Sequence, residues 1–216
     1  MAVAKAKVPD ATVSRLVTYL RVLEALERAG VTRTSSEQLA EEAQVTAFQG
    51  RKDLAYFGNY GTRGVGYSVP LLKREIRRIL GLSRRWRVVL VGMGRLGQAL
   101  ADYPGLGEEY ELVGLLDIDP AKVGKRLARG VVEPLSALEE VVSLRGAELG
   151  LIAVPADAAQ EVADRLVRAG IRGILNFAPV VLEVPPEVAV ENVDLVAGLN
   201  RLTYFVTQGM REEWVG

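Results

Sequence analysis

The sequence contains neither cysteine nor histidine among its 216 residues. Without cysteine the chain can form no disulfide and no thiolate metal site, and we expect no metal. Without histidine it lacks the proton-transfer group that many dehydrogenases place beside a nicotinamide, and no Tyr-x-x-x-Lys pair takes its place. No apolar run approaches the roughly 20 residues of a membrane span, and the N-terminus lacks the apolar stretch of a signal peptide. We therefore expect a cytoplasmic protein with no membrane partner, and a binding protein rather than an enzyme.

The formal net charge is zero, but acidic residues are scarce in the N-terminal part of the chain and basic residues are scarce in the rest. Residues 1–87 hold 16 Lys and Arg against 8 Asp and Glu, whereas residues 88–216 hold 11 against 19. A basic N-terminal part is typical of a domain that binds a polyanion, although a basic face can also be merely solvated.

The most informative motif is Gly-Met-Gly-Arg-Leu-Gly at residues 92–97. It follows an aliphatic run, residues 88–91, that predicts a buried parallel strand. In this G-x-G-x-x-G pattern Gly92 makes the strand-to-helix turn, Gly94 lets a pyrophosphate approach the backbone, and Gly97 lets the helix lie close to the strand. The alternative is a glycine-rich turn in an α/β fold that binds no dinucleotide.

An acidic residue follows at the distance that this motif requires. A second aliphatic strand, residues 112–116, ends on Asp117, 20 residues after the last glycine of the motif. A carboxylate there can accept hydrogen bonds from the ribose hydroxyls of the adenosine and repel a 2′-phosphate. The spacing therefore indicates NAD+ or NADH as the cofactor.

Strand and helix patterns alternate through the rest of this region, with further strands near residues 130–132, 149–154 and 173–179. The alternation predicts a doubly wound parallel sheet of the Rossmann type, whose ligands lie at the carboxyl ends of the strands. The candidate cofactor-binding residues are Gly92, Met93, Gly94, Arg95, Leu96, Gly97, Asp117, Ile118, Asp119, Val154, Pro155, Asn176, Ala178 and Pro179.

The basic N-terminal part has the pattern of a helical domain. Hydrophobic periodicity predicts a first helix over residues 12–29, with Val13 and Val17 in its buried stripe. Two shorter helices follow near residues 35–43 and 46–57, each opening with capping-box spacing. Two short helices around a tight turn fit a helix-turn-helix, whose second helix enters the major groove of DNA.

Polar and apolar residues divide the second of these helices into two faces. We expect Phe48, Leu54 and Phe57 to face the core. The candidate DNA-binding residues at its start and along it are Thr46, Gln49, Arg51 and Lys52.

A glycine-rich stretch, residues 58–69, predicts a β-hairpin that would form the wing of a winged helix. Arg63 at its tip suits insertion into a narrow minor groove, and Tyr67 and Ser68 could donate hydrogen bonds to phosphates. The alternative is a plain glycine-rich connector. A fourth helix, residues 71–80, adds further positive charge.

The final helix, residues 194–208, is apolar on more than one face, which is typical of a buried helix or of one covered by a partner subunit. We therefore divide the chain into a winged-helix DNA-binding domain (1–81), a Rossmann NAD(H)-binding domain (82–193) and a C-terminal helix (194–216).

These pieces in this order resemble the Rex family of redox-sensing transcriptional repressors. The resemblance covers essentially the whole chain. Its most specific segments are RKDLAYFGNYGTRGVGYSV (residues 51–69), GMGRLG (92–97), DIDP (117–120) and ILNFAP (174–179).

The resemblance implies a homodimer whose terminal helices are swapped between subunits, and double-stranded palindromic operator DNA as the partner. NADH would lower DNA affinity, and NAD+ would compete and leave the DNA-binding form in place. It further implies that Arg21, Tyr103 and Asp194 couple the two sites, although an ion pair, a packed aromatic and a helix cap are the simpler readings.

Two positions depart from the family pattern. Gly50 stands inside the recognition helix where the family usually carries an aliphatic residue, and we expect it to weaken DNA binding. Leu195 is expected near the nicotinamide, where some relatives carry an aromatic.

Three rival functions remain open. An NAD-dependent oxidoreductase with an accessory helical domain lacks the histidine or the tyrosine–lysine pair. A CoA-binding module would need a cation near the ribose, where Asp117 stands instead. A repressor whose Rossmann domain serves only dimerisation would bind DNA regardless of any nucleotide.

Overall fold

The structure is a computed structural model that describes residues 8–62 and 64–208. Arg63, the expected tip of the wing, lies outside the described residues. The described chain forms two compact units that divide between Ser83 and Arg84. Each unit has its own hydrophobic core.

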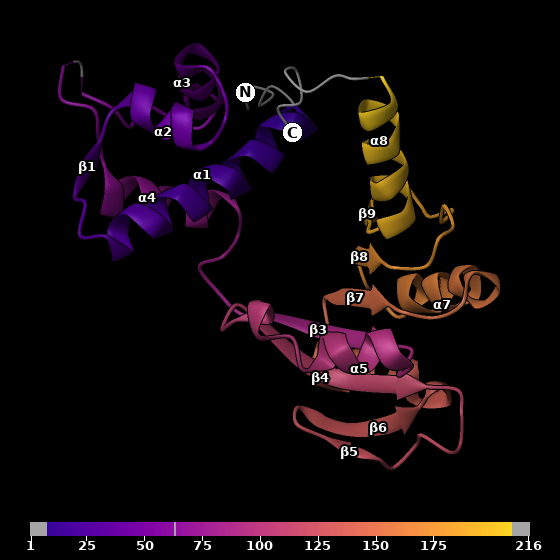
Figure 1. The fold of residues 1–216 in the computed structure, drawn as a ribbon. Helices are drawn as coiled ribbons and strands as arrows, with labels where there is room; N and C mark the ends of the chain where they lie inside the picture. The colour runs from indigo at the N-terminus through magenta and orange to yellow at the C-terminus, as the bar shows by residue number, and fades with distance from the viewer. Residues whose placement is uncertain (1–7, 63, 209–216) are drawn as a thin grey trace. The chain divides into compact units, whose positions relative to one another are not determined.

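The first unit is a helical domain with a small two-stranded sheet (Figure 1). Its helices begin where the sequence supplies caps, because the side chain of Ser35 accepts a hydrogen bond from the Gln38 amide and Thr46 accepts one from the Gln49 amide. Its elements are α1 (Asp10–Arg28), β1 (Arg33–Thr34), α2 (Ser36–Glu42), α3 (Ala47–Ala55), β2 (Tyr67–Ser68) and α4 (Val69–Ile79).

The helix-turn-helix expected of α2 and α3 is present, but the buried face of α1 differs from the prediction. Val13 and Val17 are 40% and 39% exposed, and the buried side chains include Thr12 and Tyr19 instead. Thr12 and Tyr19 are buried because both donate hydrogen bonds to a buried carboxylate on α3. Polar contacts, rather than the hydrophobic stripe alone, therefore set the rotation of α1.

The wing also differs from the predicted hairpin. Strand pairing within the described part of residues 58–69 is limited to one bridge between Thr62 and Gly66. β2 pairs instead with β1, which the sequence pattern did not reveal. A side chain at Gly66 would put its Cβ 2.3 Å from the carbonyl oxygen of Thr34, so the absence of one lets the loop pack closely against β1.

The second unit contains a seven-stranded sheet in the order β5-β6-β4-β3-β7-β8-β9. All neighbours are parallel except β5 and β6. Counted along the chain without β5, this is the strand order 3-2-1-4-5-6 of dinucleotide-binding sheets. The predicted doubly wound sheet is confirmed; β9 is its sixth strand, and β5 is an added antiparallel strand at the edge. Its strands are β3 (Trp86–Val91), β4 (Tyr110–Asp117), β5 (Arg126–Leu127), β6 (Gly130–Pro134), β7 (Leu149–Ile152), β8 (Gly173–Asn176) and β9 (Ala189–Asn192).

Helices cover both faces of this sheet because alternate residues of the strands are buried on opposite sides. Val89 and Val91 of β3 pack with α6 and α7, whereas Val88 and Leu90 pack with Ala101 of α5. The helices of this unit are α5 (Arg95–Ala101), η1 (Pro104–Leu106), η2 (Leu135–Ala137), α6 (Leu138–Arg145), α7 (Ala156–Arg168) and α8 (Leu195–Thr207).

The last helix, α8, follows β9 and buries none of its residues in this chain (Figure 1). Its exposed hydrophobic side chains are Leu195, Val196, Leu199, Leu202, Tyr204 and Val206. The helix predicted at this place is confirmed, and within a single chain its apolar surface is uncovered. None of the helices in residues 8–62 and 64–208 is both long enough and apolar enough to cross a membrane.

Candidate functional site

The glycine loop lies between β3 and α5, beside the point where the strand order of the sheet reverses. Gly92 has a φ of +98°, and a Cβ there would lie 2.4 Å from the carbonyl oxygen of Ala153. A Cβ on Gly97 would lie 1.8 Å from the carbonyl oxygen of Gly92. A Cβ on Gly94, in contrast, would meet nothing within 4 Å. Two glycines are thus needed for backbone packing, while the third leaves the loop open to a ligand.

Asp117 ends β4 next to this loop and is only 5% exposed. Its carboxylate accepts hydrogen bonds from the backbone amides of Met93 at 2.6 Å and Asp119 at 2.8 Å. Burial alone would raise its pKa, but these amides and Lys122 outweigh burial, and the pKa of Asp117 is lowered. The carboxylate is therefore ionised at neutral pH and holds the glycine loop against the end of β4.

Lys122 is a residue of this site that the sequence analysis missed. Its Nζ lies 3.0 Å from Oδ2 of Asp117 and 3.8 Å from Oδ2 of Asp119. Its side chain is 30% exposed, so the cation can meet a ligand as well as the two acids. The signal for this contact in the sequence is a lysine five residues after the acid.

The other candidate cofactor residues divide into exposed and buried sets. Met93 and Ala178 are buried, at 1% and 5% exposure, so only their backbone can face a ligand. Asp119 and Val154 are half-buried. The exposed candidates in this unit are Arg95, Leu96, Ile118, Pro155, Pro179 and Leu195.

Asn176 requires a correction. The prediction placed its amide in the cofactor site at the end of β8, but the side chain is fully buried. Its Nδ2 donates to the carbonyl oxygens of Ala178 and Val180 and to Oδ1 of Asn192, and its Oδ1 accepts from the Ala178 amide. With both of its side-chain polar atoms bonded within the chain, Asn176 holds the turn after β8, and only its backbone can face a ligand.

The three candidate coupling residues lie on different elements. Tyr103 precedes η1 and is 55% exposed, with its ring over Gly105, where a Cβ would come within 2.2 Å of the ring. Asp194 caps α8 by accepting a hydrogen bond from the Ala197 amide at 2.9 Å. Arg21 is exposed on α1. The helix cap that the sequence offered as the simpler reading of Asp194 is present.

In the first unit, α3 presents one continuous exposed face. Phe48, Arg51, Lys52 and Ala55 are all exposed and follow the spacing i, i+3, i+4, i+7. Phe48 is 70% exposed, so the expectation that it faces the core is wrong. The residues of α3 that face inward are Gly50, Asp53 and Leu54.

Asp53 fixes this orientation of α3. Its carboxylate is fully buried and accepts hydrogen bonds from the side chains of Thr12, Arg15 and Tyr19 on α1 and from Gln49 on α3. Burial would raise its pKa, but these side-chain hydrogen bonds, led by that of Arg15, lower it. Gln49, a candidate DNA contact, therefore has its amide nitrogen committed to Asp53 at 2.8 Å.

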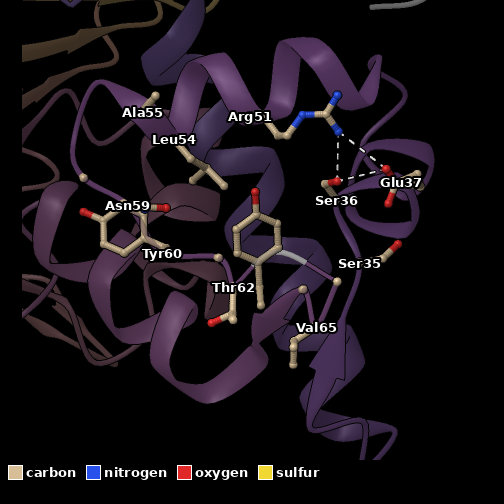
Figure 2. A pocket seen from close by; sticks show the side chains of 15 residues that line it. Ser35, Ser36, Glu37, Arg51, Leu54, Ala55, Asn59, Tyr60, Thr62 and Val65 are labelled. Carbon is tan, nitrogen blue, oxygen red and sulfur yellow. Dashed lines mark hydrogen bonds and ion pairs between the residues drawn. The ribbon is translucent and has the colours of Figure 1, made fainter.

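A cavity of about 900 Å³ lies between α3, the start of α2 and the wing loop. Arg51 extends from α3 across its edge, where Nη1 donates to the hydroxyl of Ser36 at 3.0 Å and lies 3.5 Å from Glu37 (Figure 2). The contact holds the guanidinium of Arg51 against the start of α2.

Among the remaining candidate DNA contacts, Thr46 is exposed at the start of α3 and Ser68 is half-buried at the start of α4. Tyr67 is 7% exposed and belongs to the core of the unit, where burial raises its pKa. Tyr67 also lines the cavity described above, and the phosphate contact predicted for it stays a prediction. Within the described ranges, no three His, Cys, Asp or Glu side chains gather as the ligands of a metal ion would.

Comparison with curated proteins places the chain among repressors. It is 64% identical over 97% of its length to the full redox-sensing transcriptional repressor Rex of Thermus thermophilus. It is 48% identical to Rex of Deinococcus radiodurans, covering 93% of this chain and 94% of that one. The chain belongs to the Rex family.

Solved structures extend the match from sequence to fold. This Rex-family chain superposes on RSP in complex with β-NAD+ and operator DNA with a TM-score of 0.90, at 38% identity and with 95% of each chain covered. The TM-score against RSP in complex with β-NADH is 0.86, at 37% identity and with coverage of 95% and 97%.

Two family models match separate parts of the Rex-family chain. Residues 7–55 match a model described as a putative DNA-binding protein N-terminus, and residues 83–180 match a CoA-binding domain model. The two matches fall on either side of the division between the compact units.

Proposed function

We propose that this chain is a transcriptional repressor that binds operator DNA through its first unit and NADH or NAD+ through its second. The observation that carries the proposal is the whole-chain match to RSP, a Rex-family repressor solved with β-NAD+ and operator DNA and also with β-NADH. In this proposal the protein senses whether the bound nicotinamide is oxidised or reduced, and its affinity for DNA changes accordingly.

The residues present fit a dinucleotide. The backbone at Gly94 is open where a pyrophosphate would approach, and the first amides of a helix have no partner within it. The ionised carboxylate of Asp117 stands at the end of the neighbouring strand, where ribose hydroxyls are bound in this fold. We assign the pyrophosphate to the loop of residues 92–97 and the adenosine ribose to Asp117.

The exposed face of α3 suits the major groove. Arg51 and Lys52 supply positive charge on the same side of the helix, and recognition helices contact base edges near their N-termini. Thr46 and Ser68 remain candidates for phosphate contacts, and Arg63 remains the proposed wing contact.

The chain is proposed to act as a homodimer. α8 exposes Leu195, Leu199, Leu202 and further apolar side chains, and a second copy would remove that surface from water. In the dimer, α8 of each subunit is proposed to lie against the nicotinamide site of the other. Tyr103, Asp194 and Arg21 are proposed to transmit the state of the nicotinamide to the DNA-binding unit.

Two other functions need a direct comparison. The match of residues 83–180 to a CoA-binding domain model favours CoA as the second candidate ligand. CoA carries a ribose phosphate that the ionised Asp117 would repel, although Lys122 offers a cation nearby. Against an oxidoreductase stands the absence of histidine from the sequence, and we propose that the site binds without catalysis.

The deciding experiment selects a DNA duplex from a random pool with the full-length protein and measures binding by fluorescence anisotropy at fixed salt. NADH, NAD+, NADPH and CoA are titrated in parallel. Release of the DNA at the lowest concentration by NADH supports the proposal. Release by CoA would favour the second candidate, and release by nothing would leave the Rossmann unit as a scaffold. Consumption of NADH, followed by its absorbance, would reveal an enzyme.

Gly94→Val supplies a matched control. Because no atom lies within 4 Å of the position of its Cβ, the fold has room for the side chain, which would occupy the approach of the pyrophosphate. We expect this variant to bind the same duplex as the parent protein and to lose the response to NADH. A full response in the variant would place the dinucleotide elsewhere.

A further inference from the structure

Phe48 is the most conspicuous residue of the first unit that the proposed function leaves without a role. It is the second residue of α3 and is 70% exposed, although an aromatic ring of this size normally contributes to a core or an interface. The helix has inward-facing positions, and these hold Gly50, Leu54 and the carboxylate of Asp53. α3 therefore buries a glycine and a charge while it presents a phenyl ring to the solvent.

The position of the ring on the helix indicates what it meets. Arg51 and Lys52 follow Phe48 at i+3 and i+4, the spacing at which side chains on a helix are neighbours. Side chains on a helix lean toward its N-terminus, so Phe48 lies at the leading end of this face. In a recognition helix that end contacts base edges in the major groove.

The chemistry of the ring then restricts the base. A phenyl group can neither donate nor accept a conventional hydrogen bond, so it gains nothing from the polar edges of guanine, adenine or cytosine. Thymine alone presents a methyl group in the major groove. The two flanking cations draw the helix to the phosphates and supply the polar contacts that Phe48 cannot make.

We propose that Phe48 is a specificity-determining residue that contacts the C5-methyl group of a thymine in the operator. This inference rests on the proposed DNA-binding function and adds to it the identity of one base. Because the contact is apolar, it depends on the methyl group itself and hardly on the salt concentration. A contact between Arg51 or Lys52 and a phosphate weakens as the salt concentration rises and does not depend on the methyl group.

The test removes the methyl group from the DNA and the ring from the protein, separately and together. The duplex selected with the parent protein is prepared with each thymine in turn replaced by deoxyuridine, which differs only in that methyl group. Anisotropy titrations at fixed salt compare the parent protein with Phe48→Ala. Leu71→Ala is the matched control, because Leu71 is another exposed apolar side chain of the same unit, 54% exposed on α4.

We expect one thymine per half-site whose replacement weakens binding by the parent protein about fourfold, the factor that corresponds to burying one methyl-sized apolar group. Phe48→Ala should bind the unsubstituted duplex about sixteenfold more weakly, because it removes the contact from both half-sites of the homodimer. It should no longer distinguish thymine from deoxyuridine at that position. Leu71→Ala should behave as the parent protein on every duplex.

Two results would overturn the proposal while operator binding stands. One is a parent protein that is indifferent to every thymine methyl group. The other is a Phe48→Ala variant that binds weakly but retains the full thymine preference, as expected if the ring only supports the fold. Failure of the parent protein to select any duplex would instead reject the proposed function, and this inference with it.

Discussion

Gly50 offers a direct test of how α3 is packed. It is buried inside α3, and an added Cβ would lie 3.8 Å from the hydroxyl oxygen of Tyr19 and 3.9 Å from Cβ of Ala40. Both distances are ordinary van der Waals contacts, so the site accepts a methyl group without a shift. Replacing glycine by alanine within a helix stabilises it by about 1 kcal/mol, and burial of a methyl group adds up to about 0.8 kcal/mol.

We therefore expect Gly50→Ala to raise the free energy of unfolding of the first unit by about 1.5 kcal/mol after discount for the compact unfolded chain. For a domain of this size, that corresponds to a rise in Tm of roughly 6–12 °C. Differential scanning calorimetry of the full chain measures it. DNA affinity, measured in parallel, tests whether glycine at this position weakens binding.

Alanine at Gly97 is the matched control, because there the same substitution should lower the stability instead of raising it. There a Cβ would lie 1.8 Å from the carbonyl oxygen of Gly92, so Gly97→Ala should destabilise the second unit and leave the Tm of the first unchanged. An unchanged or lowered Tm for Gly50→Ala would refute the packing of α3 against Tyr19 and Ala40 described above.

Three further changes test other parts of the structure. Asp53→Ala should destabilise the first unit by about 3–5 kcal/mol because it leaves Arg15 without its buried partner; urea unfolding measures this. The lowered pKa of Asp53 means that its contribution is present above the ordinary value of 3.8 and is lost as pH falls through the folded-state value, so the parent protein should lose more stability on acidification than the variant. Lys122→Gln should weaken the binding of NADPH relative to that of NADH by about fivefold, because a contact between two charges in water contributes about 1 kcal/mol. An unchanged ratio of the two affinities would show that Lys122 does not reach the ribose. Leu199→Glu, 61% exposed on α8, should convert a dimer into a folded monomer in analytical ultracentrifugation, and a persistent dimer would place the interface elsewhere.

The parts of the fold that were predictable are those set by neighbouring residues. The strand, glycine loop and helix around residues 86–101 follow from an aliphatic run and three glycines. The helix caps at Ser35 and Thr46 follow from their hydroxyl side chains, each of which accepts a hydrogen bond from the backbone amide three residues later. Local spacing of this kind acts the same way in any tertiary context.

Several of the differences from the prediction arise where a polar group distant in the sequence decides the outcome. Hydrophobicity predicts a buried Phe48 and gives no place to Asp53, but three of the four donors to Asp53 come from α1, up to 41 residues away in the sequence. The position of Asn176 at the end of a strand predicts a ligand group, yet its amide donates a hydrogen bond to Asn192 of the next strand. No periodicity within a single helix or strand contains these contacts, so they required the structure.

The buried carboxylate of Asp53 has a consequence for regulation. Three of its donors, Thr12, Arg15 and Tyr19, belong to α1, and Asp53 itself belongs to α3. Separating the two helices would leave the buried carboxylate with only Gln49 as a partner. Breaking a buried ion pair costs about 3–5 kcal/mol, more than the roughly 1–3 kcal/mol typical of coupling between two sites. A ligand signal of that size can reorient α1 and α3 together but cannot readily slide one past the other. If the signal reaches α1, where Arg21 is exposed, the exposed face of Phe48, Arg51 and Lys52 must move with it as a rigid body.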